Sequence, residues 1–392
     1  VLTNRGRTRD ELEYELLDTG LFDDDGYFDV FVEYAKETPE DILIRISVTN
    51  RGPDSAELHV LPTLWFRNTW SWTVDEPKPV LAQVKGRAGV SVVAARHPTL
   101  GERFLYCEGG VPLLFTENET NSERIFGTPN PSPFVKDGIN DAVVAGRMEA
   151  VNPQKMGTKA AAHYQLHLGP GETKVIQLRL AETAPQTLRD VYPVGRGNPF
   201  GRHSADVLRA RQQEADDFYA SITPDDVSPE PAAVMRQALA GMLWTKQFYD
   251  YDVVEWLRGH GYQTGDDLRQ MSVRNKEWYH MVNEDIVSMP DKWEYPWYAA
   301  WDLAFHMLPM ADVDLEFSKQ QLVLFLREWY MHPNGAIPAY EWALSDVNPP
   351  VHAWACWNVY QAGCRQGQQD RDFLARTFQK LLLNFTWWVN RK

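Results

Sequence analysis

The chain has 392 residues, of which 44% are hydrophobic, and a formal net charge of −15. The hydrophobic fraction excludes global disorder, and the acidic balance argues against nucleic acid and anionic membrane surfaces as main partners. Its cysteines (Cys107, Cys356 and Cys364) form neither a disulfide framework nor a metal cluster. We therefore expect a globular protein with a neutral ligand, no metal and no cofactor.

Residues 1–185 are predicted to be β-structure because apolar and polar residues alternate along them. In the stretch DILIRISVTNRG, Ile44, Ile46 and Val48 recur at every second position before a turn. HYQLHLGPGETKVIQLRL gives two alternating runs joined by Gly and Pro. Many short strands with turn signals favour an antiparallel β-sandwich, which we expect to be incomplete at its N-terminus.

Beyond the sandwich we expect a helical linker over residues 186–231 and helices over 232–392. The sequence TPDDVSPEP, rich in proline and acids, contains a candidate helix cap at Ser228. After it the hydrophobic period changes from two to about 3.6 residues. We therefore expect a helical array from about Ser228, with no strand in residues 232–250 or 316–330. Its apolar stripes are Met235, Leu239, Met242 and Leu243; Leu322, Phe325, Leu326 and Trp329; and a third with Trp354 and Trp357.

Both ends of the chain indicate an interior slice of a longer protein. The first residue is Val1, and the final stretch carries an apolar stripe that stops without a C-terminal cap. That stripe consists of Leu374, Phe378, Leu381, Phe385 and Trp388. No segment is long enough to span a membrane, and no signal peptide opens the chain, which favours a cytoplasmic location.

The stretch WEYPWYAAWDLAFH, residues 293–306, surrounds one aspartate with aromatic rings. A carboxylate is badly solvated there, so we expect the pKa of Asp302 to be raised, as a general acid requires. His306 lies four residues later, on the same helix face, where it can orient the carboxylate or a substrate hydroxyl. The alternatives are that Asp302 caps a helix and that His306 is a structural histidine.

The second candidate segment is a long loop followed by a helix, within HPNGAIPAYEWALSDVNPPVHAWACW, residues 332–357. Asn334-Gly335 and Pro338 break any helix there. Loops held by a rigid scaffold concentrate binding groups. The candidates are Tyr340, Glu341, Trp342 and His352, and the alternative is a surface loop with incidental aromatics.

Together, YPWYAAWDLAFH and NGAIPAYEWALSDVNPPVHAWA resemble the bacterial branch of glycoside hydrolase family 63, the processing α-glucosidase family. The resemblance covers both halves of the chain. It implies a β-sandwich, a helical linker and an (α/α)6 barrel. Glucoamylases and trehalases share that barrel, so the resemblance is more specific for the clan than for the family.

In the family that this sequence resembles, the aspartate of the Trp-Asp pair is the general acid, which corresponds to Asp302. The resemblance implies that Tyr295, Trp297 and Trp301 shape a sugar pocket. Tyr340, Glu341, Trp342, His352 and His306 would complete the carbohydrate site. The family's general base is a glutamate from a later segment, and no residue here matches it. The 165 residues from Ser228 suffice for about half of twelve barrel helices.

The leading hypothesis is therefore an inverting glycosidase for an α-linked glucoside or short α-gluco-oligosaccharide. Its partners would be a carbohydrate substrate and the missing remainder of its own chain. One alternative is a trehalase-like or glucoamylase-like hydrolase, or a disaccharide phosphorylase, on the same barrel. Another is a non-catalytic sugar-binding scaffold that uses its tryptophans as platforms.

Overall fold

The computed structural model describes residues 2–71, 77–193, 197–262, 273, 278–289, 291–292, 295–297, 299–340, 344 and 349–390. The chain divides into two compact units, Val1–Ala215 and Asp216–Lys392. The boundary falls inside the long helix α5 (Arg202–Ile222).

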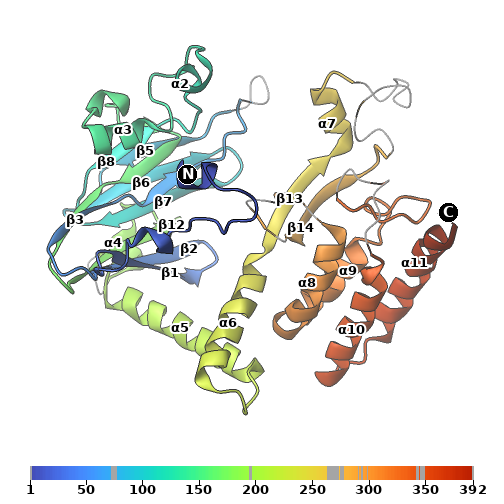
Figure 1. Cartoon of the computed structure of the whole chain (residues 1–392). Helices are drawn as coiled ribbons and strands as arrows, with labels where there is room; N and C mark the ends of the chain where they lie inside the picture. Colours follow the sequence, from blue (N-terminus) through green and yellow to red (C-terminus); the bar gives the residue numbers. More distant parts are fainter. Residues whose placement is uncertain are drawn as a thin grey trace. The chain divides into compact units, whose positions relative to one another are not determined.

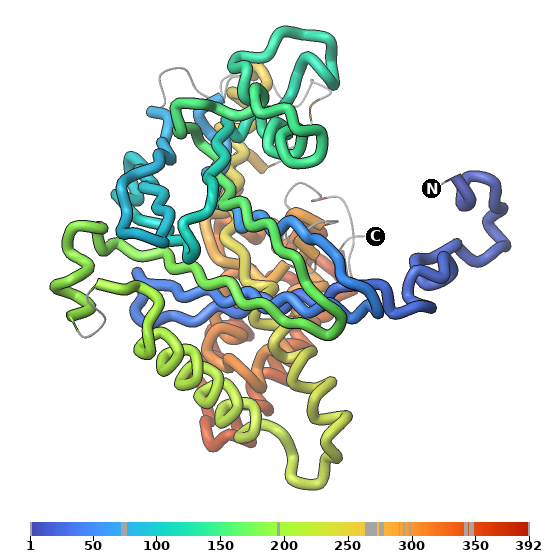
Figure 2. Tube along the Cα trace, turned by 90° about the vertical axis from the view of Figure 1, so that its left-hand side faces the viewer, coloured from blue at the N-terminus to red at the C-terminus, as the bar shows by residue number. Residues whose placement is uncertain are grey.

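The first unit contains a large antiparallel sheet. Within the described residues its strand order is β1-β2-β12-β7-β6-β5-β9. Figure 2 shows β1 and β2 (blue) and β12 (green) running side by side. The strands are β1 (Phe28–Thr38), β2 (Asp41–Asn50), β5 (Val80–Val84), β6 (Val90–His97), β7 (Gly101–Glu108), β9 (Met156–Gly157) and β12 (Thr173–Ala181).

Two smaller antiparallel sheets form a second layer, with strand orders β4-β10-β8 and β11-β3. These strands are β3 (Ala56–Val60), β4 (Thr63–Trp65), β8 (Leu113–Thr116), β10 (Lys159–Ala162) and β11 (Tyr164–Leu168). Between the layers lies an apolar core that includes Val48, Leu105, Phe115, Leu168 and Leu178. The period-two pattern of β2 explains the packing, because Ile46 and Val48 face this core while Leu43 faces the other side. The expected antiparallel β-structure in the N-terminal part is confirmed.

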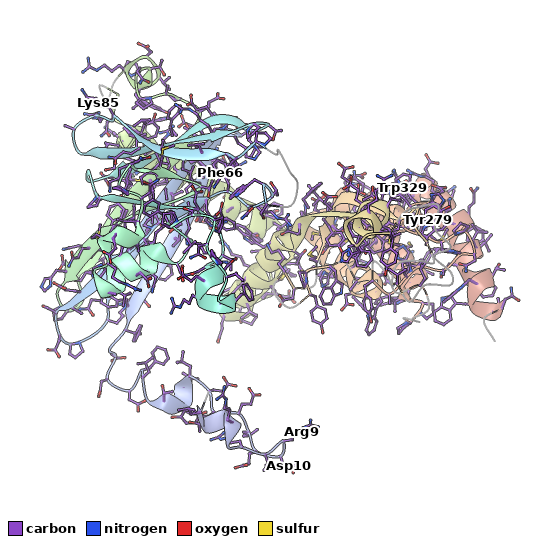
Figure 3. All side chains as sticks on the ribbon, turned by 90° about the horizontal axis from the view of Figure 1, so that it is seen from above. Arg9, Asp10, Phe66, Lys85, Tyr279 and Trp329 are labelled. Carbon is purple, nitrogen blue, oxygen red and sulfur yellow. The ribbon has the colours of Figure 1, made fainter. Side chains whose placement is uncertain are left out.

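Helices cover parts of the remaining surface. Leu208 of α5 packs on Ala35 and Leu43, on the outer face of the large sheet. Phe66, labelled in Figure 3, lies after β4 with its ring centroid 5.4 Å from that of His97. The other helical segments of the unit are α1 (Leu2–Arg5), η1 (Leu17–Thr19), α2 (Ser122–Phe126), α3 (Gly138–Ala145), η2 (Met148–Ala150) and α4 (Leu188–Val191).

The second unit is mainly helical, and Figure 1 shows α8, α10 and α11 beside one another. Its core joins Leu303, Met307, Leu322, Phe325 and Val359. Within α8, Leu303 and Met307 are four residues apart, as burial of one helix face requires. The elements are α6 (Pro229–Trp244), β13 (Lys246–Asp252), α7 (Val253–Gly259), β14 (Val282–Ser288), α8 (Ala300–Val313), α9 (Leu315–Leu324), α10 (Val351–Arg365) and α11 (Arg371–Asn390).

An array without strands from Ser228 was the wrong expectation, because residues 246–252 form β13. This strand pairs antiparallel with β14, from Lys246 opposite Ser288 to Asp252 opposite Val282. The sequence KQFYDYD contains three aromatic residues, Phe248, Tyr249 and Tyr251, and aromatic residues are enriched in strands. The helical stripe of α6 therefore ends at Trp244, and β14 begins at Val282, inside the region assigned to helices.

A second correction concerns the stripe from Leu322 to Trp329. Helix α9 ends at Leu324, and Phe325 and Leu326 are buried in the turns that follow. Trp329, labelled in Figure 3, also packs against the core from beyond the helix. The prediction from this stripe was correct about burial but wrong about the length of the helix, because turns can also bury apolar residues at three- and four-residue spacing.

Candidate active site

Asp302 lies in the first turn of α8, where the helix begins at Ala300. The N-cap residue is Ala299 and provides no side-chain capping bond, so Asp302 is not the N-cap. Its side chain is half-exposed. A carboxylate in the first turn interacts favourably with the partial positive charge of the helix N-terminus. The carboxyl group is thus held on a rigid element and reachable from solvent.

His306 lies one turn further along α8 and is fixed by a line of polar side chains. Its Nδ1 lies 2.9 Å from Oγ of Ser288, at the end of β14. That Oγ lies 2.7 Å from Oγ1 of Thr245, the C-cap residue of α6. Burial lowers the pKa of His306, and the charge of Asp302 opposes this shift only in part. The imidazole beside Asp302 is therefore neutral near pH 7.

Gln321 on α9 fixes the strand end that carries Ser288. Its Oε1 accepts a hydrogen bond from Ser288 N at 3.1 Å, and its Nε2 donates to Ile286 O at 2.8 Å. Both Gln321 and Ser288 are buried. Because β14, α8 and α9 are joined by buried polar contacts, the ring of His306 has little freedom to turn.

An exposed aromatic row runs from α8 to α10. The ring centroids of Trp301 and Phe305 are 5.8 Å apart, and those of Phe305 and Trp354 are 5.6 Å apart, both in edge-to-face geometry. All three side chains remain partly exposed to solvent. Exposed indole and phenyl rings are suited to stacking on the apolar face of a sugar ring.

A second aromatic group lies just before α8. The ring of Trp297 contacts Tyr295 at a centroid distance of 5.4 Å and Tyr340 at 6.5 Å. Backbone pairing brings the two segments together, since Ala299 bridges to Tyr340. Ala300 N also donates to Ala339 O at 2.9 Å. Predicted residues that are about 40 positions apart thus meet at the start of α8.

The loop that carries Tyr340 is fastened to α11 at Gly335. Asn384 Nδ2 donates to Gly335 O at 2.8 Å. Gly335 has φ +93°, and a Cβ there would lie 2.4 Å from Leu383 O. Only glycine fits this backbone conformation and this close approach.

His352 lies in the first turn of α10 and is 6% exposed. Its Nε2 donates to Leu322 O at 2.8 Å, and its ring stacks on Phe325. Burial lowers the pKa of His352 to about 4. Its Nδ1 is buried and has no partner within the described residues. A recess beside it is lined in part by Trp301, Trp387 and Trp388.

Glu341 and Trp342 lie outside the described residues. The sequence analysis did not single out Ser288, Thr245 or Phe305. It also did not place Trp354 in the aromatic row or Trp387 in the recess beside His352. Only Phe305 carried a signal, because it follows Trp301 at helical spacing. Ser288 and Thr245 are distant in sequence from His306, and nothing in their neighbourhoods marks them as its partners. In the described part of the chain, no group of three or more His, Cys, Asp or Glu side chains could hold a metal ion.

Residues 295–392 match the protein family described as mannosylglycerate hydrolase MGH1-like glycoside hydrolase domain. This segment is similar to glycoside hydrolases. The matched residues include Asp302, His306, Tyr340 and His352. The match supports an enzyme of the glycosidase type, and below we call residues 295–392 the glycoside hydrolase segment.

Two further proteins are similar to this chain. An uncharacterized protein of Saccharomyces cerevisiae is 40% identical over 427 residues, an alignment that covers 100% of this chain and 39% of the relative. The chain thus spans about two fifths of that relative's length. A solved structure described as a putative kojibiose phosphorylase from human microbiome has 12% identity and a TM-score of 0.27, covering 75% of this chain and 34% of that one. Within the described residues, no helix is both long and apolar enough to cross a membrane.

Proposed function

We propose that this chain is part of an inverting glycosidase that cleaves an α-linked glucoside or a short α-gluco-oligosaccharide. The observation that carries the proposal is the match of the glycoside hydrolase segment, which begins at Tyr295 and contains Asp302. In this proposal α6 to α11 belong to an (α/α)6 barrel, and the described helices α8 and α10 present their N-terminal ends to the substrate.

Asp302 is the proposed general acid. Its position in the first turn of α8 leaves the carboxyl group reachable, and Trp301 precedes it in the same turn. The half-buried, neutral imidazole of His306 adds no positive charge next to the carboxyl group. A cation there would stabilise the carboxylate and oppose protonation. The neutral imidazole is therefore compatible with the role of general acid that we propose for Asp302.

The proposed general base is a glutamate outside residues 1–392, so the remainder of the protein is a required partner. Inversion needs a water molecule between sugar and base, and the two carboxyl groups then stand about 6.5–9.5 Å apart. Among the described carboxylates that precede α8, Asp291 lies nearest to Asp302 along the chain. We assign Asp291 a structural or sugar-binding role and not that of the base; its backbone pairs with that of Tyr295.

Substitution of Asp302 by Asn in the full-length gene product tests this assignment. Asn is nearly isosteric and cannot act as an acid, so we expect turnover of an unactivated α-glucoside to fall by about 10²–10⁴-fold. An aryl glycoside with a good leaving group should lose less. The matched control is Asp312→Asn, which removes an exposed carboxylate from the same helix.

Equal losses in the two variants, or no loss in Asp302→Asn, would contradict the assignment. Circular dichroism spectra should be the same for wild type and both variants. Turnover that depends on phosphate would show that the enzyme is a phosphorylase and not a hydrolase. Sugar binding without turnover of any glycoside would leave only the scaffold alternative.

A further inference from the structure

Thr245, Ser288 and His306 form a continuous line of hydrogen bonds across α6, β14 and α8. The line starts at the backbone carbonyl of Met242, which lies 2.7 Å from Thr245 Oγ1. It continues over 2.7 Å to Ser288 Oγ and over 2.9 Å to His306 Nδ1. A carbonyl oxygen can only accept, and each hydroxyl has one proton to donate.

These facts fix the direction of every bond in the line. Thr245 donates to the Met242 carbonyl, so its oxygen must accept from Ser288. Ser288 has then used its only proton, and its oxygen must accept from Nδ1 of His306. The opposite direction would place the Thr245 and Met242 oxygens 2.7 Å apart with no proton between them.

We infer that Thr245 and Ser288 are positioning residues, which hold His306 as the Nδ1–H tautomer so that its Nε2 keeps a free lone pair. The inference rests on the proposed function, in which Nε2 accepts a hydrogen bond from a hydroxyl of the sugar bound at Asp302. Burial of the ring favours its neutral form. Within the described residues, Nε2 has no hydrogen-bond partner of its own, and Asp302 lies one turn away on the same face.

A hydroxyl acceptor is chemically useful beside a general acid. A neutral carboxylic acid donates its proton to the glycosidic oxygen, while a neighbouring Nε2 holds a sugar hydroxyl without competing as a donor. A hydrogen-bond donor at the position of Nε2 would instead compete with Asp302 for the oxygens of the sugar. Thr245 and Ser288 thus act through His306 and do not need to touch the substrate.

The test is the tautomer of His306, read from nitrogen-15 NMR of its ring in wild type, Thr245→Val and Thr245→Ser. We expect the Nδ1–H form in wild type and in Thr245→Ser, which keeps the hydroxyl. In Thr245→Val the proton of Ser288 is released for donation to Nδ1, so the Nε2–H form should increase. An Nε2–H form in wild type would overturn the inference, whether or not the variants fold.

Kinetics of the full-length gene product test the role of the acceptor. Thr245→Val should raise KM for an α-glucoside several-fold with little change in kcat, because a binding contact is lost in ground state and transition state alike. Thr245→Ser should leave both constants near wild type. A flipped tautomer with unchanged KM would overturn the role as acceptor. An inactive wild type with the Nδ1–H tautomer would refute the proposed glycosidase and leave the tautomer assignment standing.

Discussion

At the residue scale, His352 couples the fold of the second unit to pH. The ring is buried, and burial lowers its pKa to about 4, whereas an exposed histidine in the unfolded chain has a pKa of about 6.5. The unfolded chain therefore binds a proton at higher pH than the folded protein does. The contribution of His352 to stability is complete above pH 6.5 and is lost as pH falls from about 6.5 to about 4.

The first prediction follows from this difference. Between pH 7 and pH 4 the free energy of unfolding should fall by roughly 3 kcal/mol through His352 alone. Denaturant titrations at several pH values should show a smaller fall for His352→Gln, which cannot titrate. Parallel curves for wild type and variant would mean that the ring is not buried in its neutral form.

Several site residues could be predicted from sequence, because local signals mark them. Asp302 and His306 share a helix face by spacing alone, and the aromatic cluster around them is visible in the printed sequence. The line from Thr245 to His306 could not be predicted, since hydrogen bonds between distant segments leave no local pattern. The assignment of Asp302 as the acid stays a prediction.

At the scale of elements, the conformation of the loop over residues 332–340 depends on its close packing against α11. Gly335 has positive φ, and a Cβ there would strike the Leu383 carbonyl. Gly367 also has positive φ, +81°, but open space surrounds the position of its Cβ. The two glycines therefore separate backbone strain from steric overlap.

We expect Gly367→Ala to cost about 1 kcal/mol of unfolding free energy. Gly335→Ala should cost a further 1–3 kcal/mol or so, because the loop or α11 must shift. Chemical denaturation of the two variants measures the difference. Equal costs would show that the loop does not lie against α11 as described.

Hydrophobic periodicity predicted the type of some elements correctly and missed others. The alternation in β2 and the stripes of α6 and α11 gave the correct element type. β13 was missed because the change of period after Ser228 was extended over the whole C-terminal part. The separation of β14 from β13 along the chain adds to this difficulty, because no short turn marks them as a hairpin.

At the scale of the whole molecule, α10 and α11 form an apolar groove. It is lined by Ala353, Cys356, Trp357, Leu374, Thr377, Phe378, Leu381, Leu382 and Phe385. Phe378 and Phe385 belong to the apolar stripe that the sequence places on one face of the last helix, and both are largely exposed. Exposed apolar surface of this kind promotes association.

Residues 1–392 alone should therefore self-associate and lack glycosidase activity. Phe378→Lys should reduce light scattering, because a charge in the groove opposes apolar contact. Phe126→Lys, on the exposed surface of α2, is the matched control and should change scattering little. Similar effects of both substitutions would show that the groove is not the associating surface.

The most direct test of the proposed reaction is the anomer that the full-length gene product releases from an α-glucoside. Proton NMR in the first minutes of hydrolysis, before mutarotation, distinguishes the two forms. Attack by water on the face opposite the leaving oxygen should release β-glucose first. Release of α-glucose first would contradict inversion and would require a nucleophilic carboxylate about 5–5.5 Å from Asp302.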